Sequence, residues 1–207
     1  MPPTLAELHI GDAAEHWSAL GFDVVAGRCR LGTIDVTLTG PEAGRGIHGW
    51  AWRDTAGPVG VGDVPTASVH TPIPERAGPH PNGAVGLYYV VLFGPSWAEA
   101  AAELTALGLD PGQGRPMGSS PGANLRSLAD AGDVAVEVIG PVETDPARGW
   151  RLWGTIVEVA DLDATAAHLG PRLRPIKDAV QPGRRIATLE RSAGSSVALA
   201  FMGPDER

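Results

Sequence analysis

The 207-residue sequence contains a single cysteine, Cys29. One cysteine cannot form a disulfide within the chain, so a disulfide framework is excluded and the composition suits a reducing cytoplasm. No neighbouring feature of the sequence lowers the pKa of this thiol, so we interpret Cys29 as a small core residue rather than a nucleophile.

Long apolar runs and an excess of positive charge are also missing. No apolar run approaches the ~20 residues that span a bilayer, and the N-terminus MPPTLAELHIGD has no basic stretch or apolar segment of a signal peptide. The formal net charge is −8 and the pI is near 5.2, which argues against nucleic acid and anionic membranes as partners. We therefore expect a cytoplasmic protein that binds neither.

Glycine and proline, by contrast, are abundant, with 28 and 19 residues. Most lie between periodic runs and indicate the turns of a many-stranded fold. Between Asp54 and Asn82 the prolines recur without any sustained periodicity, so we interpret residues 55–83 as a surface connector. His70 and His80 lie in this connector without the spacing of a metal cluster, and we expect both to be exposed.

The C-terminal stretch, residues 150–204, has the predicted order βαβββ. Its first strand is Thr155–Val159, and the following helix is capped by Asp161 and ended by Gly170. Three extended runs come next: Pro171–Asp178, Arg185–Glu190 and Ser196–Met202. The last of these is apolar on both faces, which is typical of a buried strand.

The same order occurs upstream, in residues 84–141. Here Ser96 and Glu99 form a capping box, and Gly108 ends the predicted helix. Its predicted strands include Leu87–Phe93, Asn124–Leu128 and Val134–Ile139. The two units close on Gly140-Pro141 and Gly203-Pro204 at nearly equal distances from their helices, which indicates an internal repeat.

Residues 1–54 are interpreted as a third, contracted copy. A capping box of Asp12 and Glu15 predicts a helix that ends at Gly21. Only 20 residues separate Gly21 from the closing Pro41, too few for three strands. The predicted strands are Leu5–Ile10, Phe22–Ala26, Thr33–Thr39 and Ile47–Arg53.

The paired units resemble the vicinal oxygen chelate (VOC) superfamily, and within it the glyoxalase-like proteins. The resemblance covers about the last three-fifths of the chain and is carried by Gly154–Ala166, Asp178–Leu189, Val197–Pro204 and Val134–Pro141. It implies an α+β fold of the glyoxalase/bleomycin resistance/dioxygenase type. Paired βαβββ modules, at 84–141 and 150–204, would form one open β-barrel, with the N-terminal unit as a shorter third module.

The resemblance also implies where a metal would be held: near the start of each module's first strand and in each last strand. Aligned by helix caps and Gly-Pro closures, these positions are Tyr89, Glu137, Gly154 and Ala200. Glu137 alone is a ligand of the family type, because a phenol is largely protonated at neutral pH and the other two residues have no donor. We expect a degenerate metal site, with no metal and no other cofactor.

Glu137 is the main candidate site residue. It shares a strand face with Ala135 and Ile139, so its carboxylate is either a general base, with Tyr89 as its partner, or the anchor of a polar ligand. The alternative is a relic whose charge is satisfied by Tyr89 or Arg126. We predict that Glu137 lines a closed, ligand-sized pocket with Tyr89 in hydrogen-bonding reach.

Four further residues are candidates for contacting a substrate: Arg126, Trp153, Gln181 and Arg185. Gln181 and Arg185 belong to a predicted hairpin, where an arginine pointing inward would meet an anionic substrate and one pointing outward would be solvated. Trp153 either roofs the cavity or packs in the core.

Three classes of function remain open. The first is a metal-independent enzyme that acts on a small carbonyl-type substrate. The second is a non-catalytic protein that binds and sequesters a small molecule, like the antibiotic-resistance members of the superfamily. The third is a structural remnant. We also expect a homodimer, because VOC modules work in pairs and the N-terminal unit has no partner in the chain for its sheet edge.

Overall fold

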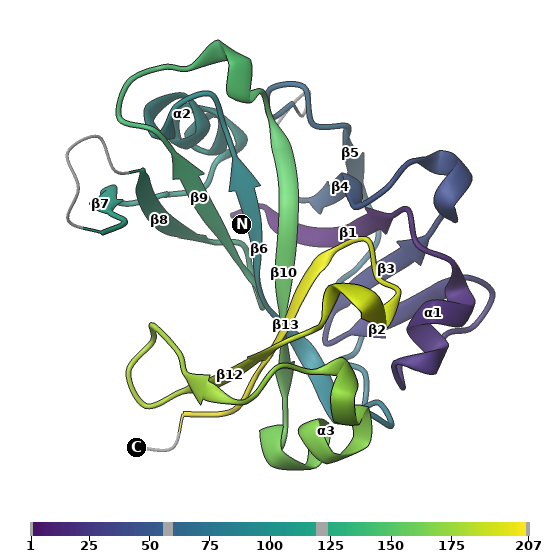
Figure 1. Cartoon of the computed structure of the whole chain (residues 1–207). Coiled ribbons are helices and arrows are strands. Elements are labelled where there is room, and N and C mark those ends of the chain that lie inside the picture. The colour runs from purple at the N-terminus through teal and green to yellow at the C-terminus, as the bar shows by residue number, and fades with distance from the viewer. Residues whose placement is uncertain (1, 56–59, 119–123, 206–207) are drawn as a thin grey trace.

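Thirteen strands form one continuous sheet in the computed structural model, which describes residues 2–55, 60–118 and 124–205 (Figure 1). The strands along its main path lie in the order β2-β3-β1-β4-β10-β6-β9-β8-β7. A branch from β10 continues through β13 and β12 to β11, and β5 lies beside β4. The described strands β7 and β11 each pair with a single neighbour, so the sheet curls without closing.

The first complete module consists of β6 (Ala84–Phe93), α2 (Trp97–Leu107), β7 (Arg115–Pro116), β8 (Leu125–Asp130) and β9 (Ala135–Gly140). Its first and last strands, β6 and β9, are parallel neighbours, and β8 and β7 continue antiparallel from β9. The helix begins as predicted: the Ser96 hydroxyl oxygen accepts from the Glu99 N–H at 3.1 Å. It ends at Gly108, whose φ of 103° lies in the left-handed region that favours glycine.

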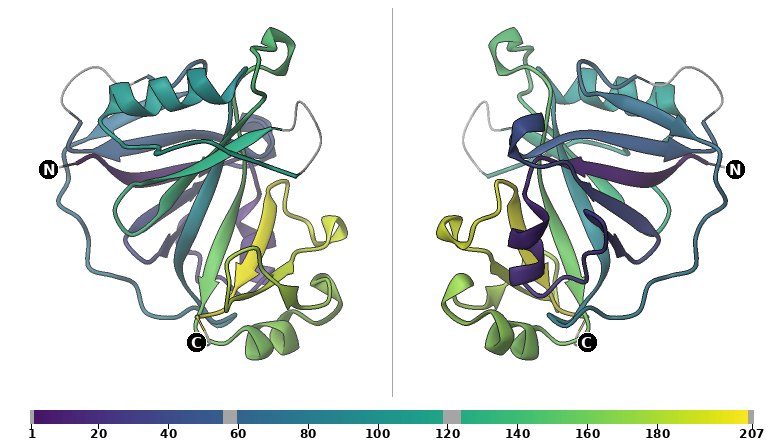
Figure 2. Two further views of the ribbon diagram at one scale, coloured as in Figure 1. Left: turned by 90° about the vertical axis from the view of Figure 1, so that its left-hand side faces the viewer. Right: turned by 90° about the vertical axis from the view of Figure 1, so that its right-hand side faces the viewer.

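The second complete module consists of β10 (Arg151–Val159), α3 (Leu162–Leu169), β11 (Lys177–Asp178), β12 (Arg185–Thr188) and β13 (Ala198–Met202). It repeats the same pairing, with β10 parallel to β13 and β12 and β11 following antiparallel. The Asp161 carboxylate caps α3 by accepting from the Ala164 N–H at 3.0 Å. The first strands of the two modules, β6 and β10, pair antiparallel. The modules are therefore related by an approximate twofold, and Figure 2 shows α2 and α3 at opposite ends of the molecule.

The N-terminal unit is a shortened module, as predicted. It consists of β1 (Thr4–Ile10), α1 (Ala14–Ala19), β2 (Arg28–Leu31) and β3 (Ile34–Leu38). Again the first strand is parallel to the last, β1 to β3, and β2 is antiparallel to β3. One strand is missing from the module: the predicted strand Phe22–Ala26 is wrong, because this segment forms only an isolated bridge between Val25 and Arg28.

A second N-terminal remnant follows. Strand β4 (Ile47–Arg53) is antiparallel to β1, as β10 is to β6, and β5 (Thr66–Val69) is parallel to β4. Strand β5 lies within residues 55–83, the proline-rich stretch that the sequence indicated as a connector. Ile47 of β4 pairs with Leu152 of β10 and so joins the N-terminal strands to the complete modules. The N-terminal unit thus has a partner within the chain on the β4 side, whereas β2 pairs with β3 alone and leaves an edge of the described sheet free.

The apolar side chains divide between the two faces of the sheet. A large cluster contains Val136 and Val138 of β9 and Leu199 and Phe201 of β13. A smaller cluster on the other face contains Tyr89, Val91, Ile139, Ile156, Ala200 and Met202. The apolar character of β13 on both faces follows, since alternate residues enter different clusters. Glu137, on β9 between Ala135 and Ile139, lies on the face of the smaller cluster.

Two polar residues differ in burial or partner from the sequence prediction. His80 is not exposed: it is 7% exposed, its Nδ1 accepts from the Asp23 N–H at 2.9 Å, and its Nε2 lies 2.9 Å from the Arg30 carbonyl oxygen. Asp12 does not cap α1, which has no side-chain cap, and its carboxylate instead accepts from Ser195 and Ser196. His70 is exposed, as expected.

Cys29 is a buried core residue, as predicted. Burial, together with the charges of Asp35 and Asp23, raises the pKa of its thiol to about 12. Among the described residues, no helix is both long and apolar enough to cross a bilayer.

Candidate functional site

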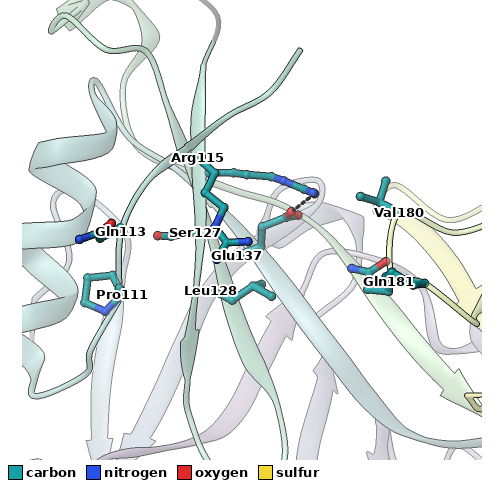
Figure 3. A pocket seen from close by; sticks show the side chains of 11 residues that line it. Pro111, Gln113, Arg115, Ser127, Leu128, Glu137, Val180 and Gln181 are labelled. Carbon is teal, nitrogen blue, oxygen red and sulfur yellow. Dashed lines mark hydrogen bonds and ion pairs between the residues drawn. The ribbon is translucent and has the colours of Figure 1, made fainter. Parts of the chain in front are cut away.

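A cavity of about 420 Å³ opens between the β7–β8 edge of the first module and the loop before β12 (Figure 3). This volume falls within the roughly 300–1,000 Å³ that is usual for small-molecule sites. Figure 3 shows Glu137 between the side chains of the two walls, with Gln113 and Pro111 on one side and Val180 and Gln181 on the other. The cavity is lined by Pro111, Gly112, Gln113, Arg115, Arg126, Ser127, Leu128, Glu137, Val180, Gln181 and Pro182.

Glu137 is the acidic residue of this lining. It projects from β9 and is 6% exposed. The guanidinium of Arg126, on the adjacent strand β8, donates from Nη1 to Glu137 Oε1 at 3.3 Å. The same two residues therefore form an ion pair at the wall of the cavity, with Arg126 on the more exposed side.

Burial raises the pKa of Glu137 above its ordinary value, because removal from water disfavours the charged form. The charge and hydrogen bond of Arg126, and a hydrogen bond from Tyr89, act in the opposite direction and offset part of that rise. The net effect is a carboxyl group that takes up a proton more readily than an exposed glutamate does.

Tyr89 lies on β6, on the same inner face as Glu137, and is 9% exposed. Burial and the nearby charge of Glu137 raise the pKa of its phenol to about 12, although a hydrogen bond from Gln181 and the charge of Arg126 lower it. The phenol is therefore protonated at neutral pH and acts as a hydrogen-bond donor. Glu137, Arg126, Tyr89 and Gln181 form one polar network, although they come from four separate segments of the chain.

The cavity is open rather than closed, contrary to the sequence prediction. At its rim, Leu128 is 46% exposed and Val180 is 71% exposed. Ligand entry thus requires no rearrangement of the described lining.

Three predicted residues lie outside the cavity lining: Tyr89, Arg185 and Trp153. Tyr89 reaches the lining only through its hydrogen bonds with Glu137 and Gln181. Arg185 points to α3, where its guanidinium donates to both carboxylate oxygens of Asp163 at 3.2 and 2.9 Å. Trp153 is 51% exposed and makes an edge-to-face contact with Phe93, with ring centroids 6.0 Å apart. It neither lines the cavity nor packs in the core.

The most informative lining residue that sequence reasoning missed is Arg115. Strand β7, which carries it, is only two residues long, so no alternation marks it in the sequence. Gln113 and Ser127 were also missed, because the sequence does not distinguish a polar residue that lines a cavity from one that is exposed to solvent. The charge of Arg115 was the one available signal.

The four positions at which the resemblance would place metal ligands can be tested for their donors. Glu137 already pairs with a cation, Arg126, and Tyr89 keeps its proton. At Gly154 a Cβ atom would lie 2.4 Å from the carbonyl oxygen of Ala198, so the backbone has no room for any side chain there. Within residues 2–55, 60–118 and 124–205, no group of three or more His, Cys, Asp or Glu residues is arranged to hold a metal ion. The side chains at these positions do not fit a divalent metal.

Comparison with solved structures identifies the fold. A mutant of 4-hydroxymandelate synthase from Streptomyces coelicolor matches 98% of this chain and 93% of its own, with a TM-score of 0.64 and 12% identity. The chain has the vicinal oxygen chelate fold.

A smaller VOC protein matches only part of the chain. Methylmalonyl-CoA epimerase from Mycobacterium tuberculosis aligns with 59% of this chain and 89% of its own, at 16% identity and a TM-score of 0.47. No family model matches the sequence, and no curated protein matches it. At 12% identity the likeness to 4-hydroxymandelate synthase extends to the fold and not to a reaction.

Proposed function

We propose that this VOC-fold protein binds a small organic molecule in the cavity beside Glu137, without a divalent metal. The observation that carries the proposal is the polar network of Glu137, Arg126, Tyr89 and Gln181 at the wall of a ligand-sized cavity. Buried polar groups cost stability unless they are paired, and a network that faces an open cavity has hydrogen-bonding capacity left for a ligand.

The absence of a metal from the proposal rests on the side chains at the four positions where the resemblance would place metal ligands. A degenerate site is supported by the missing donors of Gly154 and Ala200, by the steric conflict at Gly154 and by the pairing of Glu137 with Arg126. A divalent ion bound through Glu137 would have to displace the Arg126 guanidinium and would gain no second protein ligand from these positions. Elemental analysis of protein purified without chelators should therefore detect no stoichiometric Fe, Mn, Ni or Zn. A stoichiometric metal lost on Glu137→Gln substitution would contradict this part.

A second candidate is a metal-independent enzyme that acts on a small carbonyl compound. It is favoured by one specific observation, the raised pKa of Glu137 next to a phenol that stays protonated. In this reaction the Glu137 carboxylate removes a proton from the carbon next to the carbonyl. The electrons of that C–H bond form the enolate, whose oxygen accepts a hydrogen bond from Arg126 or Gln181 of the lining, while the Tyr89 hydroxyl stays bonded to Glu137.

Two measurements on one pair of variants separate these candidates. Binding of a fragment library is followed by NMR, and exchange of the methyl protons of pyruvate into D₂O is followed by the loss of their signal. Glu137→Gln should change the affinity of the fragments that shift cavity resonances, because it removes the negative charge of the lining, while Glu143→Gln, at an exposed position, should bind them as the unaltered protein does. Exchange that is catalysed by the unaltered protein and lost in Glu137→Gln supports the enzyme. Equal fragment binding by Glu137→Gln and the unaltered protein would contradict a site beside Glu137.

The predicted homodimer and the cytoplasmic location stay predictions. Their direct tests are light scattering across a wide concentration range and fractionation of the source cells.

A further inference from the structure

Two arginines lie directly opposite each other at the mouth of the cavity. Arg115 of β7 pairs in register with Arg126 of β8, and both line the cavity. Directly opposed side chains of an antiparallel pair have Cβ atoms about 5 Å apart, and like charges at such positions destabilise the sheet. The repulsion between the two guanidinium groups must therefore be offset by a negative charge nearby.

The protein supplies that compensation for one arginine only. Glu137 accepts from Arg126 at 3.3 Å, and no other residue of the lining is acidic. Arg115 has no ion pair with any residue that the structure describes. The wall thus has an excess positive charge even when Glu137 is ionised, in a chain whose formal net charge is −8.

The rest of the lining is uncharged and partly apolar. Ser127 Oγ accepts from the Trp97 indole N–H at 3.0 Å, which leaves the proton of its hydroxyl free to be donated. Gln113 and Gln181 provide amide groups, and the apolar contacts come from Pro111, Leu128, Val180 and Pro182. The charged side chains lie on one wall, and the opposite wall, residues 180–182, has no charge. The lining therefore fits a molecule with a charged end and an uncharged body.

We propose that the cavity selects a small organic anion whose oxyanion group lies between Arg115 and Arg126. This inference rests on the proposed function, because it assigns a ligand class to the same cavity. The planar guanidinium groups match a carboxylate or a phosphate, with each donating two N–H groups in parallel. Glu137 holds Arg126 through Nη1 and leaves its other N–H groups for the ligand. The body of the anion extends toward Val180, Gln181 and Pro182.

The test uses three probes that share a phenyl ring and differ in the head group: benzoate, phenyl phosphate and benzamide. Binding is followed at low salt through the side-chain Nε–Hε resonances of the arginines and the side-chain amide resonances of the glutamines. We expect benzoate or phenyl phosphate to bind saturably, at least about tenfold more tightly than benzamide, and to weaken as NaCl is added. The stronger of the two anions identifies the head group as carboxylate or phosphate.

Variants assign the effect to the arginine pair. Arg115→Met should weaken binding of the preferred anion about tenfold or more and leave benzamide unaffected, because only the charged head group needs the guanidinium. Arg115→Lys should bind the anion more tightly than Arg115→Met, because lysine keeps the positive charge but lacks the two parallel N–H groups of the guanidinium. Arg191→Met, at an exposed arginine outside the lining, is the matched control and should bind as the unaltered protein does.

Two outcomes would overturn the inference, and they are distinguishable. If benzamide shifts the cavity resonances as strongly as benzoate and Arg115→Met changes nothing, the anion preference is wrong while the cavity remains a binding site. If none of the three probes shifts any cavity resonance up to its solubility limit, both the anion preference and the proposed function are contradicted.

Discussion

The carboxylate of Asp12 accepts a hydrogen bond from the backbone N–H of Ser196, 184 residues further along the chain, at 2.8 Å. Its second oxygen accepts from the Ser195 hydroxyl at 2.8 Å and from the Trp17 indole N–H at 3.0 Å. Asp12 is 3% exposed, and its carboxylate accepts one buried and two partly buried hydrogen bonds. They connect the N-terminal unit to the loop before the last strand.

Replacing Asp12 should destabilise the whole chain. Asp12→Ala removes the acceptor of one buried and two partly buried donors, and we expect a loss of about 3 kcal/mol in the free energy of unfolding, since each donor left without its partner costs ~1–3 kcal/mol. Urea denaturation measures the loss. Asp63→Ala, at an exposed aspartate, should stay within about 0.5 kcal/mol of the unaltered protein. A loss below about 1 kcal/mol for Asp12→Ala would mean that these bonds contribute little.

The same network makes stability depend on acid. Burial by itself would raise the pKa of Asp12, but the hydrogen bonds from Ser196, Trp17 and Ser195 together hold it below its ordinary value. A lowered folded-state pKa stabilises the protein above the unfolded-state pKa of ~3.9, and the contribution is lost as the pH falls through the folded-state value. The stability difference between the unaltered protein and Asp12→Asn should therefore shrink on acidification below about pH 4. A difference that is constant with pH would contradict the lowered pKa.

Glu137 should show the opposite dependence. Its folded-state pKa is raised by burial, so the folded protein holds the proton more tightly than the unfolded chain does. The carboxyl group then contributes no penalty below the unfolded-state pKa of ~4.3, and a penalty develops as the pH rises toward the folded-state value. Relative to the unaltered protein, Glu137→Gln should gain stability between about pH 4 and neutral pH. Thermal melting of both proteins across this pH range measures the stability difference. A difference in favour of Glu137→Gln that declines as the pH rises would refute the prediction.

Tyr89 provides a spectroscopic test of the same environment. The chain has two tyrosines, and the Tyr89 phenol has a pKa of about 12 because it is buried and faces Glu137. An absorbance titration of the phenolate should therefore contain a transition near pH 12 that Tyr89→Phe removes and Tyr88→Phe retains. In addition, Tyr89→Phe should raise the pKa of Glu137 further, because a hydrogen bond that favours its charged form is lost. A carboxyl carbon titration by NMR measures that change.

The two histidines of the proline-rich stretch form a matched pair for mutagenesis. His80→Ala removes an acceptor for the Asp23 N–H and a partner of the Arg30 carbonyl, both within the N-terminal unit, and also an edge contact with Phe22. We expect a loss of about 2–3 kcal/mol in the free energy of unfolding from two partly buried hydrogen bonds and the packing of the ring. His70→Ala, at an exposed position, should change stability by less than about 0.5 kcal/mol. Equal effects of the two substitutions would show that His80 does not fix this stretch.

The sequence predicted those features of the fold that depend on residues close together in the chain, such as helix caps, helix ends and the alternation of strands. Ser96 and Asp161 each cap a helix by accepting from the N–H group three positions further on, and Gly108 ends a helix through its own φ. The period-2 alternation of β9 likewise put Glu137 on the face opposite Val136 and Val138. These signals, repeated in two units, were enough to give the module order.

The failures concern side chains whose partners are distant in the chain. Asp12 has the local signature of a helix cap, yet its carboxylate accepts from Ser195 and Ser196, and these partly buried donors outweigh the N-terminus of a short helix. Of two neighbouring arginines in one hairpin, Arg184 pairs with Glu158 and Arg185 with Asp163. Their sequence contains no information on which points where. Arg115 enters the cavity only because a two-residue strand pairs with β8.

The bonds of Asp12 also constrain the order in which the molecule can be completed during synthesis. The segment around Asp12 is made before the donors at Ser195 and Ser196, which are added 183 and 184 residues later and become available only once they have left the ribosome. Until then a carboxylate destined for burial remains hydrated, and the N-terminal strands cannot reach their final stability. A nascent chain stalled while Ser195 is still inside the ribosome should accordingly be cleaved by protease within its first 55 residues, and one carrying a C-terminal linker long enough to bring Gly203 outside the ribosome should resist.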